Sequence, residues 1–198
     1  MRVVIVGRKW LGAAVLQRCL ARGDDVVAVC APTGGDRADR LAAAARHAAV
    51  PVVDLDGAPA CEAIVAAHAH AWIGPEVRAR ARRGVLAYHP SLLPLHRGRD
   101  AVSWAIRMRE RVTGGTVYWM TDTPDAGPIV AQRHALIRPD DTPAALWRRS
   151  LGPLGVELVD AALALLDAGA APAVPQDESL ATWEPALSRP RLAEAGGG

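Results

Sequence analysis

The stretch RVVIVGRKWLGAAVLQRCLARGDDVVAVCA, residues 2–31, decides the fold class of this chain. It opens with an apolar, β-branched run that predicts a strand ending at Gly7. A helix is predicted over 10–21, because apolar residues recur there on one side. A second apolar run begins at Asp25, so the two strands are expected to pair in parallel through a right-handed crossover. The opening therefore predicts an α/β fold.

The alternation of strands and helices continues along the chain, and it predicts a mostly parallel sheet with helices on both faces. The expected elements are helices over 37–48, 75–83 and 101–110, strands over 50–55, 63–67, 115–120 and 129–137, and a helix over 142–168 that breaks near Gly152 and Pro153. The segment GVLAYHPSLLPLHRGRDA, residues 84–101, is interpreted as a long apolar loop because prolines and glycines interrupt it. A loop of this kind is seldom only a connection.

The length of 198 residues predicts one catalytic domain over 1–170 and a C-terminal extension over 171–198, whose end we expect to be disordered. A net charge of +2 is too small to indicate a nucleic-acid partner, and no apolar run is long enough for a membrane span. The start lacks the pattern of a signal peptide, so we expect a cytoplasmic protein. The pattern does not indicate an oligomeric state.

The cysteines and one group of arginines have ordinary interpretations. Three cysteines are scattered without paired spacing, which favours reduced core thiols over a disulfide framework or a zinc site: Cys19, Cys30 and Cys61. Four arginines lie close together at positions 78, 80, 82 and 83. They could meet phosphates or carboxylates, but such a cluster is more often the solvated face of a helix.

Two loops carry titratable residues between rigidifying prolines and glycines. The first contains His89, followed by Pro-Ser-Leu-Leu-Pro, and the second contains Asp122 and Asp125, followed by Gly-Pro. In an open α/β sheet, ligands bind beyond the carboxyl ends of the strands. A histidine and a carboxylate held together there would form an acid/base pair. Each residue alone is more often a turn or surface residue.

At these loops the sequence resembles the 10-formyltetrahydrofolate-dependent formyltransferases and hydrolases. The resemblance rests on H-P-S-L-L-P at 89–94, R-G at 97–98 and D-x-x-D-A-G at 122–127. It extends more weakly to the opening strand and turn, to VPVVDL, to the Asp-Asp-Thr at 140–142 and to ATWEP in the tail.

The resemblance implies a Rossmann-like formyltransferase domain with folate in a cleft between the two loops and 10-formyltetrahydrofolate as formyl donor. By motif position, His89 matches the family's catalytic histidine and Asp125 its catalytic aspartate. Contacts to the folate are implied for Leu92, Thr121, Asp122, Thr123 and Gly127. Contacts to the acceptor are implied for Ser91, Arg97, Gly98, His68 and His70.

One position departs from the family's pattern. Transferases of this family usually have Asn two residues before the histidine, and here that residue is Ala87. The asparagine amide donates to the oxyanion, and removing such a donor costs about 10²–10³ in rate. The hydrolase domain of 10-formyltetrahydrofolate dehydrogenase also lacks the asparagine and has a similar Y-H-P-S-L-L-P segment. By contrast, G-R-D at 98–100 followed by Trp104 resembles the formylating domains of peptide synthetases.

We therefore expect formyl transfer to the amine of a small or carrier-bound metabolite, with hydrolysis to formate or a catalytically weak folate-binding protein as alternatives. The chain has no room for the β-barrel that tRNA formyltransferases append, so a tRNA acceptor is not expected. A metal site at His68 and His70 lacks a third ligand at suitable spacing. The segment from Gly7 to Gly12 lacks the full dinucleotide fingerprint, which argues against an oxidoreductase.

Overall fold

A six-stranded sheet forms the centre of the protein, with the strand order β2-β1-β3-β4-β5-β6. The computed structural model describes residues 1–32, 39–69 and 71–187. The strands are β1 (Arg2–Gly7), β2 (Asp25–Cys30), β3 (Ala63–Ala67), β4 (Val85–His89), β5 (Val112–Trp119) and β6 (Ile129–Leu136). The first four strands pair in parallel, whereas β5 runs antiparallel to both β4 and β6. The predicted α/β fold with a mostly parallel sheet is confirmed.

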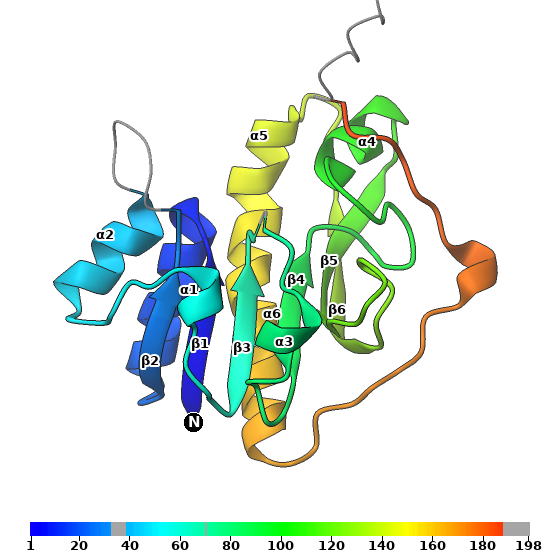
Figure 1. The fold of residues 1–198 in the computed structure, drawn as a ribbon. Coiled ribbons are helices and arrows are strands. Elements are labelled where there is room, and N and C mark those ends of the chain that lie inside the picture. The colour runs from blue at the N-terminus through cyan, green and yellow to red at the C-terminus, as the bar shows by residue number, and fades with distance from the viewer. Residues whose placement is uncertain (33–38, 70, 188–198) are drawn as a thin grey trace, which may run out of the picture.

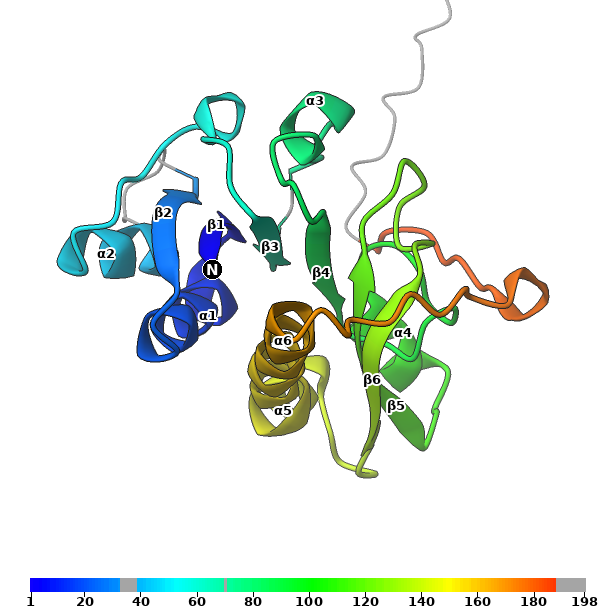
Figure 2. The same cartoon turned by 90° about the horizontal axis from the view of Figure 1, so that it is seen from below.

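Helices and loops cover both faces of the sheet (Figures 1 and 2). On one face lie α1 (Lys9–Ala21) and α6 (Gly152–Asp167), with α2 (Arg40–His47) beside α1. The opposite face carries α3 (Pro75–Arg78). Alternate residues of β1 point to opposite faces of the sheet. Val3 and Ile5 belong to the apolar core on one face, and Val4 and Val6 belong to the core on the other. Between β4 and β5 the chain forms α4 (Ala101–Arg107), which contacts α5 (Pro143–Leu146).

The predicted strand over 50–55 is wrong, because this segment makes only one bridge to the sheet. The Val29 N–H donates to the Pro51 carbonyl over 2.8 Å, and the Val53 N–H donates to the Val29 carbonyl over 3.0 Å. Pro51 has no N–H of its own, and the chain turns into a 3₁₀ helix at Leu55–Gly57. The segment thus covers part of the edge of β2 without extending the sheet.

The predicted loop over 84–101 begins with a strand. Residues Val85–His89 form β4, and all five are buried between β3 and β5. The interpretation as loop was wrong here because a strand buried on both faces lacks alternation and is followed directly by prolines. This correction makes His89 the last residue of a central strand.

The expected break near Gly152 and Pro153 is instead a continuous change of helix type. A π-helical turn at Trp147–Leu151 joins α5 to α6. A proline has no N–H to give to the preceding turn, and the wider turn accommodates that loss without ending the helix. The helices α2, α3 and α4 are shorter than predicted, and residues 37 and 38 lie outside the described residues.

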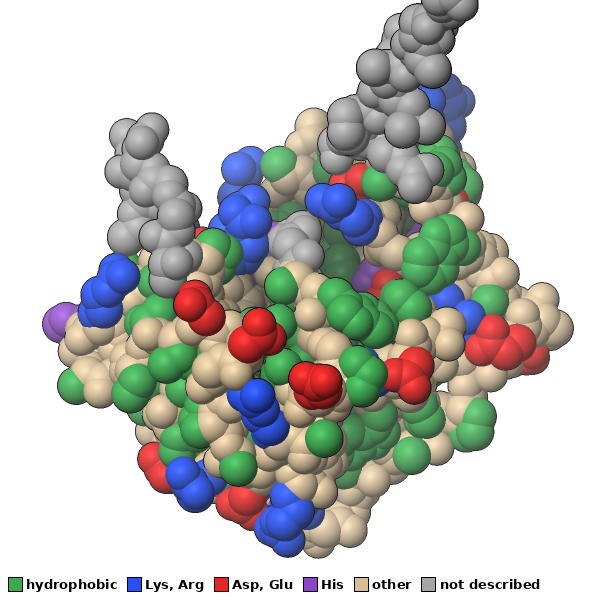
Figure 3. Space-filling view, in the orientation of Figure 1, with side chains coloured by type: hydrophobic (Ala, Val, Ile, Leu, Met, Phe, Trp, Pro, Cys, Tyr) green, Lys and Arg blue, Asp and Glu red, His purple; other side chains and the backbone are tan. Residues whose placement is uncertain are grey.

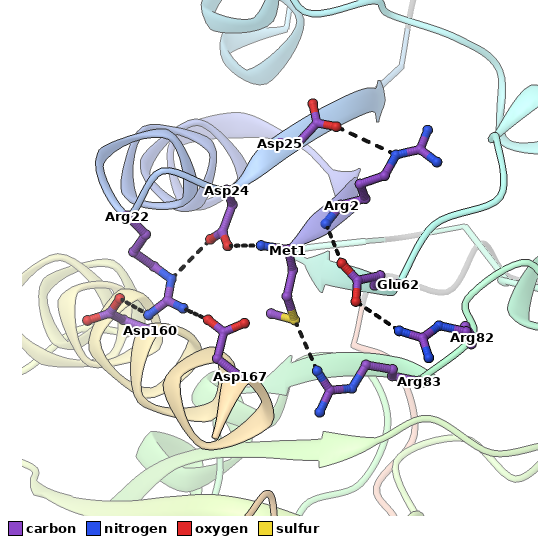
Figure 4. A network of polar contacts seen from close by, with 10 residues as sticks. All are labelled: Met1, Arg2, Arg22, Asp24, Asp25, Glu62, Arg82, Arg83, Asp160 and Asp167. Carbon is purple, nitrogen blue, oxygen red and sulfur yellow. Dashed lines mark hydrogen bonds and ion pairs between the residues drawn. The ribbon is translucent and has the colours of Figure 1, made fainter. Parts of the chain in front are cut away.

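A polar network ties the beginning of the chain to α1 and α6 (Figure 4). The Met1 amine donates to Asp24 over 3.0 Å, and the Arg22 Nε donates to the same carboxylate over 3.0 Å. Arg22 also reaches Asp160 and Asp167 on α6, and Arg18 donates to Asp160 over 2.6 Å. These bonds fix α6 against α1 on the side of the sheet away from α3.

After α6 the chain runs along β6 and returns toward α4 (Figure 1). We call residues 170–187 the tail. Val174 bridges Ile129 at the edge of β6, and Trp183 bridges Arg97. The expected disorder of the end of the chain concerns residues 188–198, which are not among the described residues.

The three cysteines are buried with free thiols, as predicted. Burial raises the pKa of Cys19 to about 12 and that of Cys30 to about 11. Both thiols therefore stay protonated at neutral pH and act as small apolar groups. In the described part of the chain, no helix is long and apolar enough to cross a bilayer.

Candidate active site

His89 ends β4 with its side chain on the α3 face of the sheet, the same face as Ala87. The residue is 7% exposed. Its Nε2 lies 2.7 Å from the backbone carbonyl oxygen of His96. Since a carbonyl only accepts, this contact places a proton on Nε2 and leaves Nδ1 for other chemistry.

Asp125 reaches His89 from an unexpected direction. Because β5 is antiparallel to β4, it ends beside the beginning of β4, where Trp119 pairs with Leu86. The loop over 120–128 must therefore fold back across the α3 face of the sheet. It brings Asp125 Oδ2 to 3.7 Å from His89 Nδ1. The two side chains meet as predicted, but over the sheet face and not at two neighbouring carboxyl ends.

The Asp125 carboxylate is held by two short hydrogen bonds. The Tyr118 hydroxyl donates to Oδ1 over 2.6 Å, and the Gly98 N–H donates to Oδ2 over 2.7 Å. Burial and then the neighbouring Asp125 charge raise the pKa of Tyr118 well above its ordinary value. The phenol therefore remains a donor at all physiological pH values, and the carboxylate has a fixed orientation toward His89.

Both ring nitrogens of His89 face oxygen acceptors. A neutral imidazole has one N–H and can donate to only one of them, whereas a charged ring can donate to both. The 3.7 Å between Nδ1 and Asp125 exceeds a direct hydrogen bond. At this separation a substrate oxygen or a water lying to one side can contact both Nδ1 and the Asp125 carboxylate. The arrangement is suited to general acid/base work and to stabilising a developing oxyanion.

The loop that follows His89 is fixed by polar contacts beneath it. The Thr116 hydroxyl donates to the Ser91 carbonyl over 2.7 Å and accepts from the Leu93 N–H over 3.2 Å. Ser91 is fully buried, and its own hydroxyl donates to the Leu95 carbonyl over 2.6 Å. Ser91 therefore shapes this loop from below, and its hydroxyl is engaged within the protein.

Two glycines are required by the geometry. Gly98 has a φ of +93°, and a Cβ there would lie 3.2 Å from the Trp183 ring. A Cβ at Gly127 would lie 1.7 Å from the Trp119 carbonyl oxygen. Any side chain at Gly127 would force the loop carrying Asp125 away from β5.

The other predicted folate contacts lie in two places. Leu92 packs over Gly114 of β5, where a Cβ would come within 2.5 Å of it. Thr121, Asp122 and Thr123 are exposed, and the Asp122 carboxylate accepts from Arg78. Arg78 also lies 5.5 Å from the ring of the exposed Trp72. Residues 121–123 form an exposed rim on the loop that carries Asp125.

The predicted acceptor contacts are mostly engaged within the protein. Arg97 is 7% exposed, and its guanidinium donates to Gln176 and Glu178 of the tail. His68 follows β3, and its ring centroid lies 5.6 Å from that of Trp147. His70 lies outside the described residues. Among the residues that are described, no three His, Cys, Asp or Glu side chains are placed to hold a metal ion.

Three residues of the site were missed by the sequence reasoning. Tyr118 orients Asp125, His96 accepts from His89, and Gln176 donates to the Asp125 and Gly127 carbonyls over 2.8 and 2.7 Å. Tyr118 could have been found from the sequence, because the alternation of side chains along a strand puts it on the same face as Thr116. Gln176 had none, since its role depends on the path of the tail.

The α3 face is hollowed at its centre, and a histidine and a carboxylate side chain are visible on the wall of the hollow (Figure 3). A separate cavity of about 220 Å³ opens at the carboxyl ends of β1, β2 and β3. It is lined by Val6, Gly7, Arg8, Cys30, Ala31, Pro32, Val53, Asp54, Leu55, Ala69 and Ala71. His89 and Asp125 are not among its lining residues, so this cavity is distinct from the place where the two side chains meet.

Comparisons with known proteins identify the family of this chain. The family model for the formyl transferase domain matches residues 42–153, so the chain belongs to the formyl transferase family. Mouse mitochondrial 10-formyltetrahydrofolate dehydrogenase is 33% identical over 93% of this chain and 22% of its own length. Methionyl-tRNA formyltransferase of Chlorobium chlorochromatii is 32% identical over 96% of this chain and 66% of its own length. This chain spans only about a fifth of the dehydrogenases that it matches.

Solved structures show the same fold. The N-formyltransferase of Helicobacter canadensis, solved with folinic acid and dTDP-3-aminofucose, gives a TM-score of 0.82 at 18% identity, covering 93% of this chain and 70% of that one. HypX of Aquifex aeolicus, solved with tetrahydrofolic acid, gives 0.72 at 25% identity, covering 93% and 29%. Both relatives were thus solved with a folate bound.

Proposed function

We propose that this chain transfers the formyl group of 10-formyltetrahydrofolate to the amine of a small or carrier-bound metabolite. The observation that carries the proposal is the 3.7 Å approach of His89 Nδ1 to an Asp125 carboxylate fixed by Tyr118 and Gly98. Family membership supports the reaction class, and the folates bound to related proteins support the donor.

The chemistry assigns a distinct role to each residue. The amine adds to the formyl carbon, and the formyl oxygen becomes an oxyanion that His89 stabilises through an N–H at Nδ1, since Nε2 donates to the His96 carbonyl. The bond from that carbon to N10 of the folate then breaks. The proton lost by the amine must reach N10, and Asp125 relays it through His89 or a water. The products are the formylated amine and tetrahydrofolate.

Hydrolysis is a second candidate, favoured by one specific observation. Ala87 lies on the same strand face as His89 and is only 4% exposed, within an apolar group that includes Val85, Leu93 and Tyr118. No amide is available at this position to hold the oxyanion. Water as the nucleophile would release formate, with His89 and Asp125 in the same roles.

Release of tetrahydrofolate, followed by absorbance with and without candidate amines, tests the proposal. Asp125→Asn should lower turnover about 100-fold, because it keeps the shape but removes the charge beside His89. The exposed Asp140 offers a matched control, since Asp140→Asn changes the charge by the same amount away from the site. An equal effect of both substitutions would refute the assignment, and formate appearing without amine would favour hydrolysis.

A further inference from the structure

The tail meets the site at His96, a residue with an unusual environment for a loop histidine. His96 is 4% exposed and has a φ of +54°. Its Nε2 lies 2.8 Å from Glu110 Oε1, and its Nδ1 lies 3.0 Å from Glu184 Oε2 of the tail. The Nδ1 contact has the distance of an ion pair without the alignment of a hydrogen bond. Two carboxylates from distant parts of the chain thus confine one buried ring.

The backbone of His96 is held by the tail as well. Its N–H donates to the Thr182 hydroxyl over 2.7 Å, and the next residue, Arg97, donates its N–H to the Thr182 carbonyl over 3.0 Å. A left-handed backbone is unfavourable for a residue with a side chain and persists only when its surroundings impose it. Here the surroundings are Glu110 on one side and the tail on the other.

This held backbone is in direct contact with the chemistry. The His96 carbonyl accepts from His89 Nε2 over 2.7 Å, and two residues later the Gly98 N–H donates to Asp125. A rotation of the peptide at His96 would move the acceptor that fixes the His89 ring. It would also shift the donor that fixes the Asp125 carboxylate.

We propose that His96 is a positioning residue for His89 and that Glu184 of the tail acts through it. His96 sets the plane and the protonated nitrogen of the His89 ring through its backbone carbonyl, while Glu184 and Glu110 keep its side chain in place. The tail then helps to orient the His89 ring. The catalytic consequence rests on the proposed formyl transfer, whereas the orientation of the His89 ring does not.

The first measurement is turnover of 10-formyltetrahydrofolate by the full chain. Glu184→Ala should lower kcat about 10- to 100-fold, because a small displacement of a catalytic group is costly, and should leave KM for the folate within about twofold. Glu157→Ala is the matched control, because Glu157 is an exposed carboxylate on α6 that pairs with Arg133. Glu184→Gln serves if Glu184→Ala does not fold.

A double-substitution cycle tests whether Glu184 affects turnover through the His96 ring. Asn adopts the left-handed backbone more readily than most residues, so His96→Asn removes the ring with little backbone penalty. If Glu184 acts through the His96 ring, Glu184→Ala should cause no further loss in the His96→Asn background. Fully additive losses would overturn the proposal.

A substrate-free measurement separates this proposal from the proposed function. Nitrogen-15 spectra of the histidine rings, with His89 assigned from His89→Gln, should show a slowly exchanging proton on Nε2 in the unsubstituted chain and in Glu157→Ala. Glu184→Ala should lose that protection. An unsubstituted chain without turnover would defeat the proposed function, and an unchanged His89 signal in Glu184→Ala would defeat the positioning role.

Discussion

Tyr118 on β5 pairs with Ala87 on the neighbouring strand β4, and the Tyr118 hydroxyl donates to Asp125 over 2.6 Å. Cross-strand partners in an antiparallel pair share a face. The phenol therefore lies beside Ala87, where the resemblance implies asparagine in transferases, and its hydroxyl ends on the Asp125 carboxylate. β5 thus supplies a polar contact beside an apolar position of β4.

Tyr118→Phe should lower turnover about tenfold, because the carboxylate loses one of its two donors and a hydrogen bond to a charged group contributes about 1.5–3 kcal/mol. Steady-state kinetics checks this. Tyr88→Phe is the matched control, since the Tyr88 hydroxyl donates over 2.7 Å to the Leu151 carbonyl on the opposite face of the sheet. Equal losses of turnover in both variants would contradict a specific role for Tyr118.

Ala87→Asn should lower both turnover and stability. Ala87 is 4% exposed and packed in an apolar group, so the larger amide would crowd the site and need partners that the group does not offer, at a cost of about 1–3 kcal/mol. Ala66→Asn provides a control, because Ala66 pairs with Ala87 on the neighbouring strand and is 3% exposed. A tenfold rise in kcat for Ala87→Asn would show that the position accepts an oxyanion donor.

Acid should weaken the contact between α1 and α6. The Arg18 guanidinium, and then Arg22, lower the pKa of Asp160 below its ordinary value. A lowered pKa in the folded state means that stabilisation is present above the ordinary carboxyl pKa of about 4 and is lost as the pH falls through the lowered value.

Urea unfolding of Asp160→Asn tests this effect. The variant should be less stable by about 1 kcal/mol at pH 7, because the carboxylate is partly exposed and pairs with arginines across two helices. The difference from the unsubstituted chain should shrink below about pH 4. A difference that stayed constant between pH 7 and pH 3 would rule out the charge as its cause.

Chelation should leave turnover unchanged. The formyl carbon arrives already activated on the folate, and side chains suffice for the proton transfers. Turnover is compared before and after dialysis against EDTA. A loss that added zinc restores would direct attention to His68 and His70 as ligands.

Much of the fold could be predicted from local patterns, and the site only in part. The run before Gly7 has the β-branched composition of a strand, and the motifs around His89 and Asp125 identify the two loops. Pairing within the sheet is not local. The antiparallel direction of β5, which sends the Asp125 loop across the sheet face, depends on contacts between distant segments.

The contribution of the tail could not be predicted for the same reason. Gln176 and Glu184 lie in a proline- and alanine-rich stretch whose composition indicates an extension with little structure. Their partners, the Asp125 loop and His96, are 49 and more residues away in the sequence. Only the folded chain brings them together.

The two bridges at the margins of the sheet have a consequence for self-association. Val174 pairs with Ile129 on β6, and the segment around Val52 pairs with Val29 on β2. Both outermost strands therefore have part of their free backbone groups occupied by short pieces of the same chain. An exposed outer strand is a template on which another molecule can add its own strand and start aggregation. The tail and the segment around Val52 thus hinder the addition of a strand from another molecule. Removing either segment would expose the backbone groups of the outer strand that it pairs with.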